Sequence, residues 1–84
     1  MKFIARPIEV DAGIISTVQP GEKGVTHLVV HGLGQFLKDD SFDADAGMTA
    51  RYQPVPGDYL VRQPDGYLYL NPKHVFESKY RPAS

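Results

Sequence analysis

The alternation of apolar and polar positions is most regular in the last third of the chain, where two short apolar and aromatic runs lie close together. These runs are Asp58–Arg62 and Tyr67–Leu70, and they flank the tetrad Gln63-Pro64-Asp65-Gly66. Proline at the second position, aspartate at the third and glycine at the fourth are typical of a type I turn. The pattern therefore predicts a β-hairpin with a four-residue turn.

The hydrophobic period changes at Asn71-Pro72, directly after the hairpin. Asparagine is a favoured N-cap, and proline fits the first helical position because its missing N–H is not needed there. Phe76 and Tyr80 lie four residues apart with Val75 beside them, which places the three on one stripe of a helix. We expect a short C-terminal helix that packs on the sheet through this stripe.

The first half of the chain carries weaker strand signals, interrupted by glycine and proline. Proline within a strand favours an edge position, because it lacks a hydrogen-bond donor. The expected segments are an edge strand at Phe3–Val10 that ends at 11–13, a short strand or helical turn at 14–18, a strand at Val25–Val30, a bulge or turn at 32–37, an exposed acidic loop at Lys38–Gly47 and a resumed strand at Met48–Tyr52. Together they predict a single α+β domain over residues 1–84, in which a small antiparallel sheet, open or barrel-like, carries the C-terminal hairpin and helix.

The chain has 84 residues, no cysteine and a formal net charge of −1. A domain of this size buries only about 60–65% of its unfolded surface, which leaves little room for a deep active site. Residues 1–45 hold four basic and seven acidic side chains, whereas residues 46–84 hold five and three. The overall charge gives no steering toward nucleic acid or an anionic membrane, and no apolar run reaches the roughly 18 residues of a membrane span. We expect a soluble, cytoplasmic protein, which the lack of cysteine fits.

Three histidines raise the question of a metal site. His27 and His31 are four residues apart on an expected strand, where Cα atoms lie about 13 Å apart, too far for both rings to bind one ion at about 2.1 Å. The acidic stretch from Asp43 lacks the ligand spacing of an EF-hand loop, and Gly32-Leu33-Gly34 lacks the third glycine of a dinucleotide-binding fingerprint. We therefore predict no metal, no cofactor and no catalytic residues, and we do not expect an enzyme.

The candidate binding residues lie on the hairpin. A four-residue turn would place Arg62, Tyr67 and Tyr69 on one face. Tyrosine rings and a guanidinium can stack on a base or anchor a protein partner. The alternative is ordinary cross-strand pairing, in which the tyrosine rings cover apolar surface and their hydroxyls stay in water. The expected partner is a protein or a small nucleotide-like ligand; nucleic acid is disfavoured and a membrane is not expected.

Short motifs stand at both ends of the chain. They are Arg6-Pro7-Ile8-Glu9-Val10-Asp11-Ala12 near the N-terminus and, in the last third, Gly57-Asp58-Tyr59-Leu60-Val61, Gly66-Tyr67 with Tyr69, Pro72, and Phe76-Glu77 with Tyr80. These motifs resemble a family of small tailed-phage and prophage proteins. That family often has cysteine before the helix, where this chain has Leu70 and Asn71. The resemblance implies a hairpin-and-helix scaffold and a phage or prophage origin, and it carries over no catalytic residue.

Two classes of function remain open. The first is a phage accessory protein that binds a host enzyme, a defence protein or a signalling nucleotide, and the second is a minor structural or assembly component of the virion. We expect the first, because short reading frames of this kind usually lie outside the structural gene modules. A homo-oligomer is also expected, because edge strands at Phe3–Val10 and Val25–Val30 would leave apolar surface for a symmetric dimer to cover.

Overall fold

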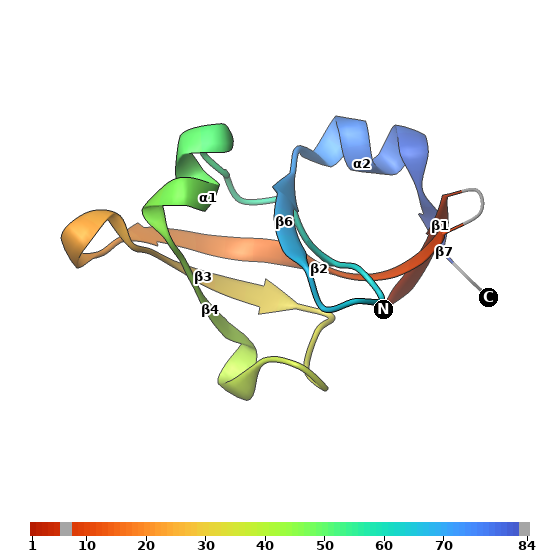
Figure 1. Cartoon of the computed structure of the whole chain (residues 1–84), viewed down its shortest axis with the longest axis horizontal. Helices are drawn as coiled ribbons and strands as arrows, with labels where there is room; N and C mark the ends of the chain where they lie inside the picture. Colours follow the sequence, from red (N-terminus) through yellow and green to blue (C-terminus); the bar gives the residue numbers. More distant parts are fainter. Residues whose placement is uncertain (6–7, 83–84) are drawn as a thin grey trace.

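The computed structural model describes residues 1–5 and 8–82, and consists mainly of one curled antiparallel sheet with two short α-helices (Figure 1). In chain order the elements are β1 (Lys2–Ala5), β2 (Ile8–Pro20), η1 (Glu22–Gly24), β3 (Thr26–His31), η2 (Lys38–Asp40), β4 (Ser41–Ala44), α1 (Ala46–Arg51), β5 (Tyr59–Arg62), β6 (Leu68–Asn71), α2 (Lys73–Lys79) and β7 (Arg81–Pro82), where η marks a short 3-10 turn. The fold is α+β and dominated by its sheet, in agreement with the predicted class.

The 13-residue strand β2 is the spine of the sheet. Two of its residues have partners on both edges: Asp11 pairs with Lys2 and Arg62, and Ile14 pairs with His31 and Tyr59. Since a strand residue has one neighbour on each edge, β1 and β3 lie end to end along one edge of β2, and β5 lies along the other. Strands β2, β3 and β4 form a meander and β5 returns beside β2, which gives the Greek-key order β5-β2-β3-β4.

A bulge at Ser16 bends β2. The pairing changes from Ile15 opposite Val30 to Thr17 opposite Val29, so that Ser16 is the extra residue. A bulge increases the local twist of its strand. The sheet accordingly curls around one of its faces into a half-barrel (Figure 1).

Each face of the sheet packs against its own hydrophobic cluster. The cluster under α2 consists of Phe3, Val10, Ala12, Tyr59, Val61, Phe76 and Tyr80. The other cluster, which we call the inner cluster, lies on the inner face of the sheet, inside the curl. It consists of Ile15, Leu28, Val30, Leu33, Ala44 and Leu60. Strand β5 contributes to both clusters through alternate residues, and all of its apolar side chains are buried. The centre of the sheet is therefore covered on both sides.

The N-terminal half differs from the prediction. The expected edge strand at Phe3–Val10 is a two-stranded hairpin in which Phe3 pairs with Val10, and residues 6–7 of that segment lie outside the described part of the chain. Residues 11–13 do not end a strand but run through the middle of β2. Gly13 is required there, because a Cβ would lie 2.5 Å from Cγ1 of Val30. A glycine that resembled a strand end therefore permits close approach of two strands. The strands expected at 14–18 and at 25–30 are confirmed.

The acidic segment was also predicted wrongly. The expected loop at Lys38–Gly47 contains η2 and β4, and the expected strand at Met48–Tyr52 is mostly helix α1. Phe42 on β4 packs against the inner cluster. Asp45 begins α1, because its Oδ1 accepts a hydrogen bond from the N–H of Met48 at 2.9 Å. The four-residue strand carries too few apolar positions to stand out among its acidic neighbours.

The C-terminal hairpin is confirmed, but its register differs from the prediction by one residue. Arg62 pairs with Leu68, so five residues, 63–67, connect the strands. The N–H of Gly66 donates to the carbonyl of Gln63 at 2.8 Å, so the expected turn lies inside this longer loop. Because successive strand residues point to opposite faces, the shift moves every side chain of β6 to the face opposite the predicted one.

Helix α2 docks on the sheet as predicted, through fewer side chains. Phe76 is fully buried and Tyr80 is nearly so. The Phe76 ring centroid lies 4.0 Å from that of Tyr59 and 4.7 Å from that of Tyr80, both in stacked arrangements. Val75 is 42% exposed, so its predicted part in docking is wrong. Two aromatic residues one helical turn apart make the contact.

Asp58 joins three segments of the C-terminal half. Its carboxylate is buried and accepts hydrogen bonds from the Tyr52 hydroxyl at 2.6 Å, the Val55 N–H at 2.9 Å and the Lys73 N–H at 2.9 Å. Burial opposes ionisation, but these hydrogen bonds outweigh it and hold the pKa of Asp58 below its usual value. The hydrogen bond to Asp58 and burial raise the pKa of Tyr52 to about 12. Asp58 thus caps the start of α2, and the predicted cap, Asn71, instead lies in β6.

The predicted oligomer edges are not free edges. Strand β3 lies between β2 and β4, and β1 lies between β2 and β7. Within residues 1–5 and 8–82, β4 pairs only with β3, and β6 pairs only with β5. In the same part of the chain, the two-residue strand β7 pairs only with β1. Backbone groups able to accept a further strand therefore lie on β4, on β6 and, over two residues, on β7.

Candidate functional site

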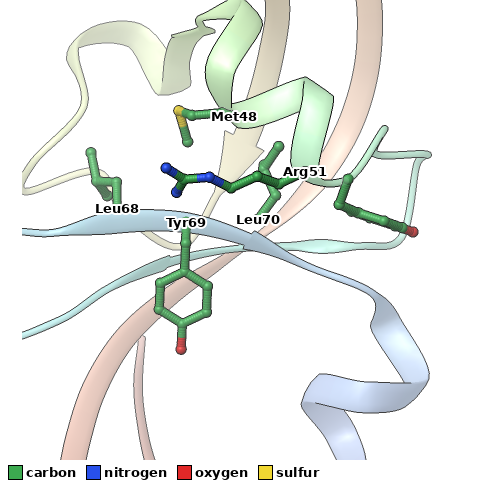
Figure 2. A pocket seen from close by; sticks show the side chains of 6 residues that line it. Met48, Arg51, Leu68, Tyr69 and Leu70 are labelled. Atoms are coloured by element: carbon green, nitrogen blue, oxygen red, sulfur yellow. The ribbon is translucent and has the colours of Figure 1, made fainter.

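Helix α1 lies beside β6, and we call the boundary between these two elements the seam (Figure 2). A hollow at this seam is lined by Met48, Arg51, Tyr52, Leu68, Tyr69 and Leu70. A second, shallower hollow is lined by Asp45, Gly47, Met48, Arg51, Tyr67 and Leu68. The two hollows adjoin, because they share Met48, Arg51 and Leu68 as walls, and together we call them the seam groove.

The size of the seam groove limits what it can hold. Its inner part encloses about 40 Å³, and its outer part, about 320 Å³, is open to solvent. Small-molecule sites are typically enclosed clefts of about 300–1,000 Å³ that bury most of the ligand. The seam groove therefore suits contact with another macromolecule better than enclosure of a nucleotide.

Arg51 and Tyr67 form the rim of the seam groove, and both are exposed. Nη1 of Arg51 donates a hydrogen bond to the Tyr67 hydroxyl at 2.8 Å. The Tyr67 ring also stacks with that of Tyr69, with centroids 6.1 Å apart and an interplanar angle of 28°. Figure 2 shows Arg51 and Tyr69 on opposite sides of β6, with Met48 on the side of Arg51. These contacts hold the rim side chains in one arrangement before any partner binds, which lowers the entropic cost of contact.

The three predicted binding residues do not share one face. Arg62 lies on the inner face, where its guanidinium carbon is 4.0 Å from the ring centroid of Phe36. Tyr69 lies on the other face, and its hydroxyl is 3.1 Å from that of Tyr80. Burial and this hydrogen bond raise the pKa of Tyr69. Only Tyr67 and Tyr69 lie together, at the seam groove, because the one-residue change of register separated them from Arg62.

The seam groove also contains residues that the sequence did not nominate. Met48 and Arg51 come from α1, in a segment expected to be a strand. The N-cap signal of Asp45 before this segment was available in the sequence, because aspartate commonly begins a helix. No local pattern indicates that α1 lies beside β6, because that contact depends on the curl of the whole sheet.

The outer edge of β6 carries unpaired backbone groups. The N–H of Gln63 donates to the carbonyl of Tyr67 at 2.8 Å, so the backbone of Tyr67 points toward β5. Because backbone direction alternates along an antiparallel strand, Tyr69 also points toward β5, whereas Leu68 and Leu70 point away from it. Each of these two leucines thus directs one N–H and one carbonyl away from β5, and both residues line the inner part of the seam groove.

Histidine and acidic side chains gather elsewhere, on the exposed face of β3 and β4. Nδ1 of His27 is 2.5 Å from Oδ1 of Asp43. Nδ1 of His31 is 3.4 Å from Oδ2 of Asp40, and its Nε2 is 3.1 Å from Oγ of Ser16. The contacts resemble a catalytic triad, with Ser16 in the place of the nucleophile, His31 in that of the base and Asp40 in that of the carboxylate. The His31 side chain, however, is 61% exposed. Such a group lacks the water exclusion that makes preorganised polar groups effective in catalysis. Within the described residues, no group of three or more His, Cys, Asp or Glu side chains could hold a metal ion.

Comparison with known proteins gives one informative likeness. No family model matches the chain, and no curated protein matches it. Among solved structures, the chain is similar to the NMR solution structure of the monomeric form of the phage L decoration protein, with a TM-score of 0.61 and 26% sequence identity. The match covers 92% of this chain and 54% of that one, so the chain spans about half the length of the decoration protein. This likeness supports a relationship to phage proteins. No helix in the described part of the chain is long and apolar enough to cross a membrane.

Proposed function

We propose that the protein is a minor structural component of a tailed-phage virion that binds to the head as a decoration protein. The observation that carries this proposal is the likeness to the phage L decoration protein, which extends over 92% of the chain. Of the two functions considered from the sequence, this likeness favours the virion component over an accessory protein with a host target.

The geometry of the seam groove fits this proposal. Tyrosine, arginine and methionine are enriched at protein–protein interfaces, and the groove brings together Arg51, Tyr67 and Met48. The outer part of the groove, about 320 Å³, is open to solvent and so does not enclose a small ligand such as a signalling nucleotide. A protein surface is therefore the partner that the groove suits best.

The proposal is tested by head binding. The gene is deleted from the phage genome that encodes it, heads are purified, and recombinant protein is added back before sedimentation through a density gradient. We expect the protein to sediment with the heads in a saturable amount, and mass spectrometry of the undeleted virions to detect it. The matched control is an unrelated domain of similar length and charge, which should stay at the top of the gradient. Failure of the protein to sediment with heads would reject the proposal, and its absence from purified virions would do so independently.

A further inference from the structure

We infer that the seam groove is the surface that docks on the phage head, by taking an extended segment of the head's surface protein as an added strand along the free edge of β6. This inference rests on the proposed function and names the part of the chain that performs it. It commits to a partner with an extended backbone and a carboxylate side chain.

The requirement for an extended backbone comes from β6. Leu68 and Leu70 direct two N–H groups and two carbonyls away from β5, in the spacing of an antiparallel or parallel ladder. Only another extended chain presents donors and acceptors at that spacing, which is the basis of recognition by strand addition. The side chains of both leucines are half-buried against the inner cluster, and they offer the groove only apolar surface, without a charge that would select the partner.

Selection of the partner therefore depends on the rim. Arg51 uses one N–H on the Tyr67 hydroxyl, and its remaining donors face the seam groove. The carboxylate of the nearby Asp45 already accepts from the N–H of Met48. An arginine with free donors binds a carboxylate with two parallel hydrogen bonds, so an aspartate or glutamate on the added segment fits beside Arg51. Tyr67 supplies a large contact area at low cost in rotamer entropy.

A second copy of this chain is the competing occupant, through the free edge of β4 or of β6, since β7 has only two residues. Both β4 and β6 contain only four residues, and Pro72 directly follows β6. Pairing between two such short strands covers far less than the roughly 800 Å² per partner of a standard interface. A head offers additional surface around the added strand, so we assign the seam groove to the head protein.

Hydrogen exchange of the protein, alone and on heads that lack it, tests the docking mode directly. In the free protein, the amides of Leu68 and Leu70 should exchange quickly and that of Tyr69 slowly, because of these three only the N–H of Tyr69 points toward β5. On heads, Leu68 and Leu70 should become protected. Protection that appears without heads, and grows with protein concentration, would assign the edge to a second copy and overturn the inference.

Two variants and one control test the same surface by head sedimentation. Arg51→Glu reverses the rim charge and should weaken head binding about tenfold or more, as loss of an interface anchor does. Leu70→Pro removes an outward N–H without removing a bond to β5 and should have a similar effect. Lys79→Glu is the matched control, because Lys79 is exposed on α2, away from the seam groove, and it should bind as the unmodified protein does.

The outcomes separate the two proposals. If the unmodified protein binds heads, Arg51→Glu binds equally well and Leu68 and Leu70 gain no protection, the docking surface lies elsewhere and the proposed function stands. If the unmodified protein does not bind heads, the proposed function fails and the inference fails with it. If Leu70→Pro lowers stability, the hydrogen-exchange result and Arg51→Glu decide the question.

Discussion

Asp58→Asn is the substitution that most sharply tests how the C-terminal half is held together. The buried carboxylate accepts from Tyr52, Val55 and Lys73, and an amide of the same shape has only one accepting oxygen. In either orientation its NH₂ group faces at least one donor. A buried donor without an acceptor costs about 1–3 kcal/mol, more where the lost acceptor was charged. We therefore expect the free energy of unfolding to fall by about 2–3 kcal/mol, which for a domain of this size corresponds to a drop in Tm of about 10–20 °C.

The effect of Asp58→Asn should depend on pH. The folded pKa of Asp58 lies below its unfolded value of about 3.9, so the folded state binds fewer protons between the two pKa values. The stabilisation is therefore complete above the unfolded pKa and is lost as pH falls through the folded one. Urea unfolding at pH 7 and at about pH 2.5 should show a difference between the two proteins that shrinks in acid. Asp39→Asn, on an exposed turn, is the control and should change stability little at either pH. A loss below about 1 kcal/mol at pH 7, or an equal loss at both pH values, would refute this account of Asp58.

Further predictions concern packing, tyrosine ionisation and metal. Phe76→Ala should lower the free energy of unfolding by about 3–5 kcal/mol, because Phe76 is fully buried. Val75→Ala is the control and should lower it by less than about 0.5 kcal/mol, because Val75 is exposed. Similar melting temperatures of the two variants would contradict the docking of α2. Burial, with a hydrogen bond to Glu77, raises the pKa of Tyr59 to about 12, and the pKa of Tyr52 is also about 12, so absorbance titration should show delayed ionisation. Because these folded pKa values exceed the unfolded value of about 10, that stabilisation is complete below pH 10 and is lost as pH rises through 12. Chelator should leave Tm unchanged, and a stoichiometric zinc content by elemental analysis would oppose this expectation.

The elements that the sequence predicted well are those with a strong local signal. The hairpin at 58–70 and the helix after it carry both turn chemistry and a regular period, and both are present. The register is different, because a type I turn can close a five-residue loop as well as a four-residue one. A shift of one residue was enough to place Arg62 and Tyr69 on opposite faces. The predicted binding face depended on that single register and is therefore absent.

The elements that the sequence missed are defined by distant contacts. Strand β2 reads as two pieces because Gly13 interrupts its apolar pattern, yet the glycine is fixed by the nearness of Val30. Helix α1 is only six residues long, and its position beside β6 follows from the curl at Ser16. The seam groove combines α1 with β6, so no single stretch of sequence contains its pattern. Tyr67 and Tyr69 were nominated because aromatic clustering is visible locally, whereas Arg51 was not.

The sharing of β2 between two clusters has a consequence for the order in which the chain folds during synthesis. Residues of β2 leave the ribosome early, but Asp11 pairs with Arg62, and Ala12 of β2 shares its cluster with Phe76. To form these contacts, the chain must bring together segments that are about 50 to 65 residues apart, and such non-local pairing is slow. The early hairpins β1–β2 and β2–β3 therefore wait, with apolar surface exposed, until β5 and α2 have been made. A nascent chain stalled before residue 59 should remain sensitive to protease. A second chain carries, after residue 84, a linker long enough to span the ribosomal tunnel, so that α2 is outside the ribosome. This chain should become resistant to protease in a single step.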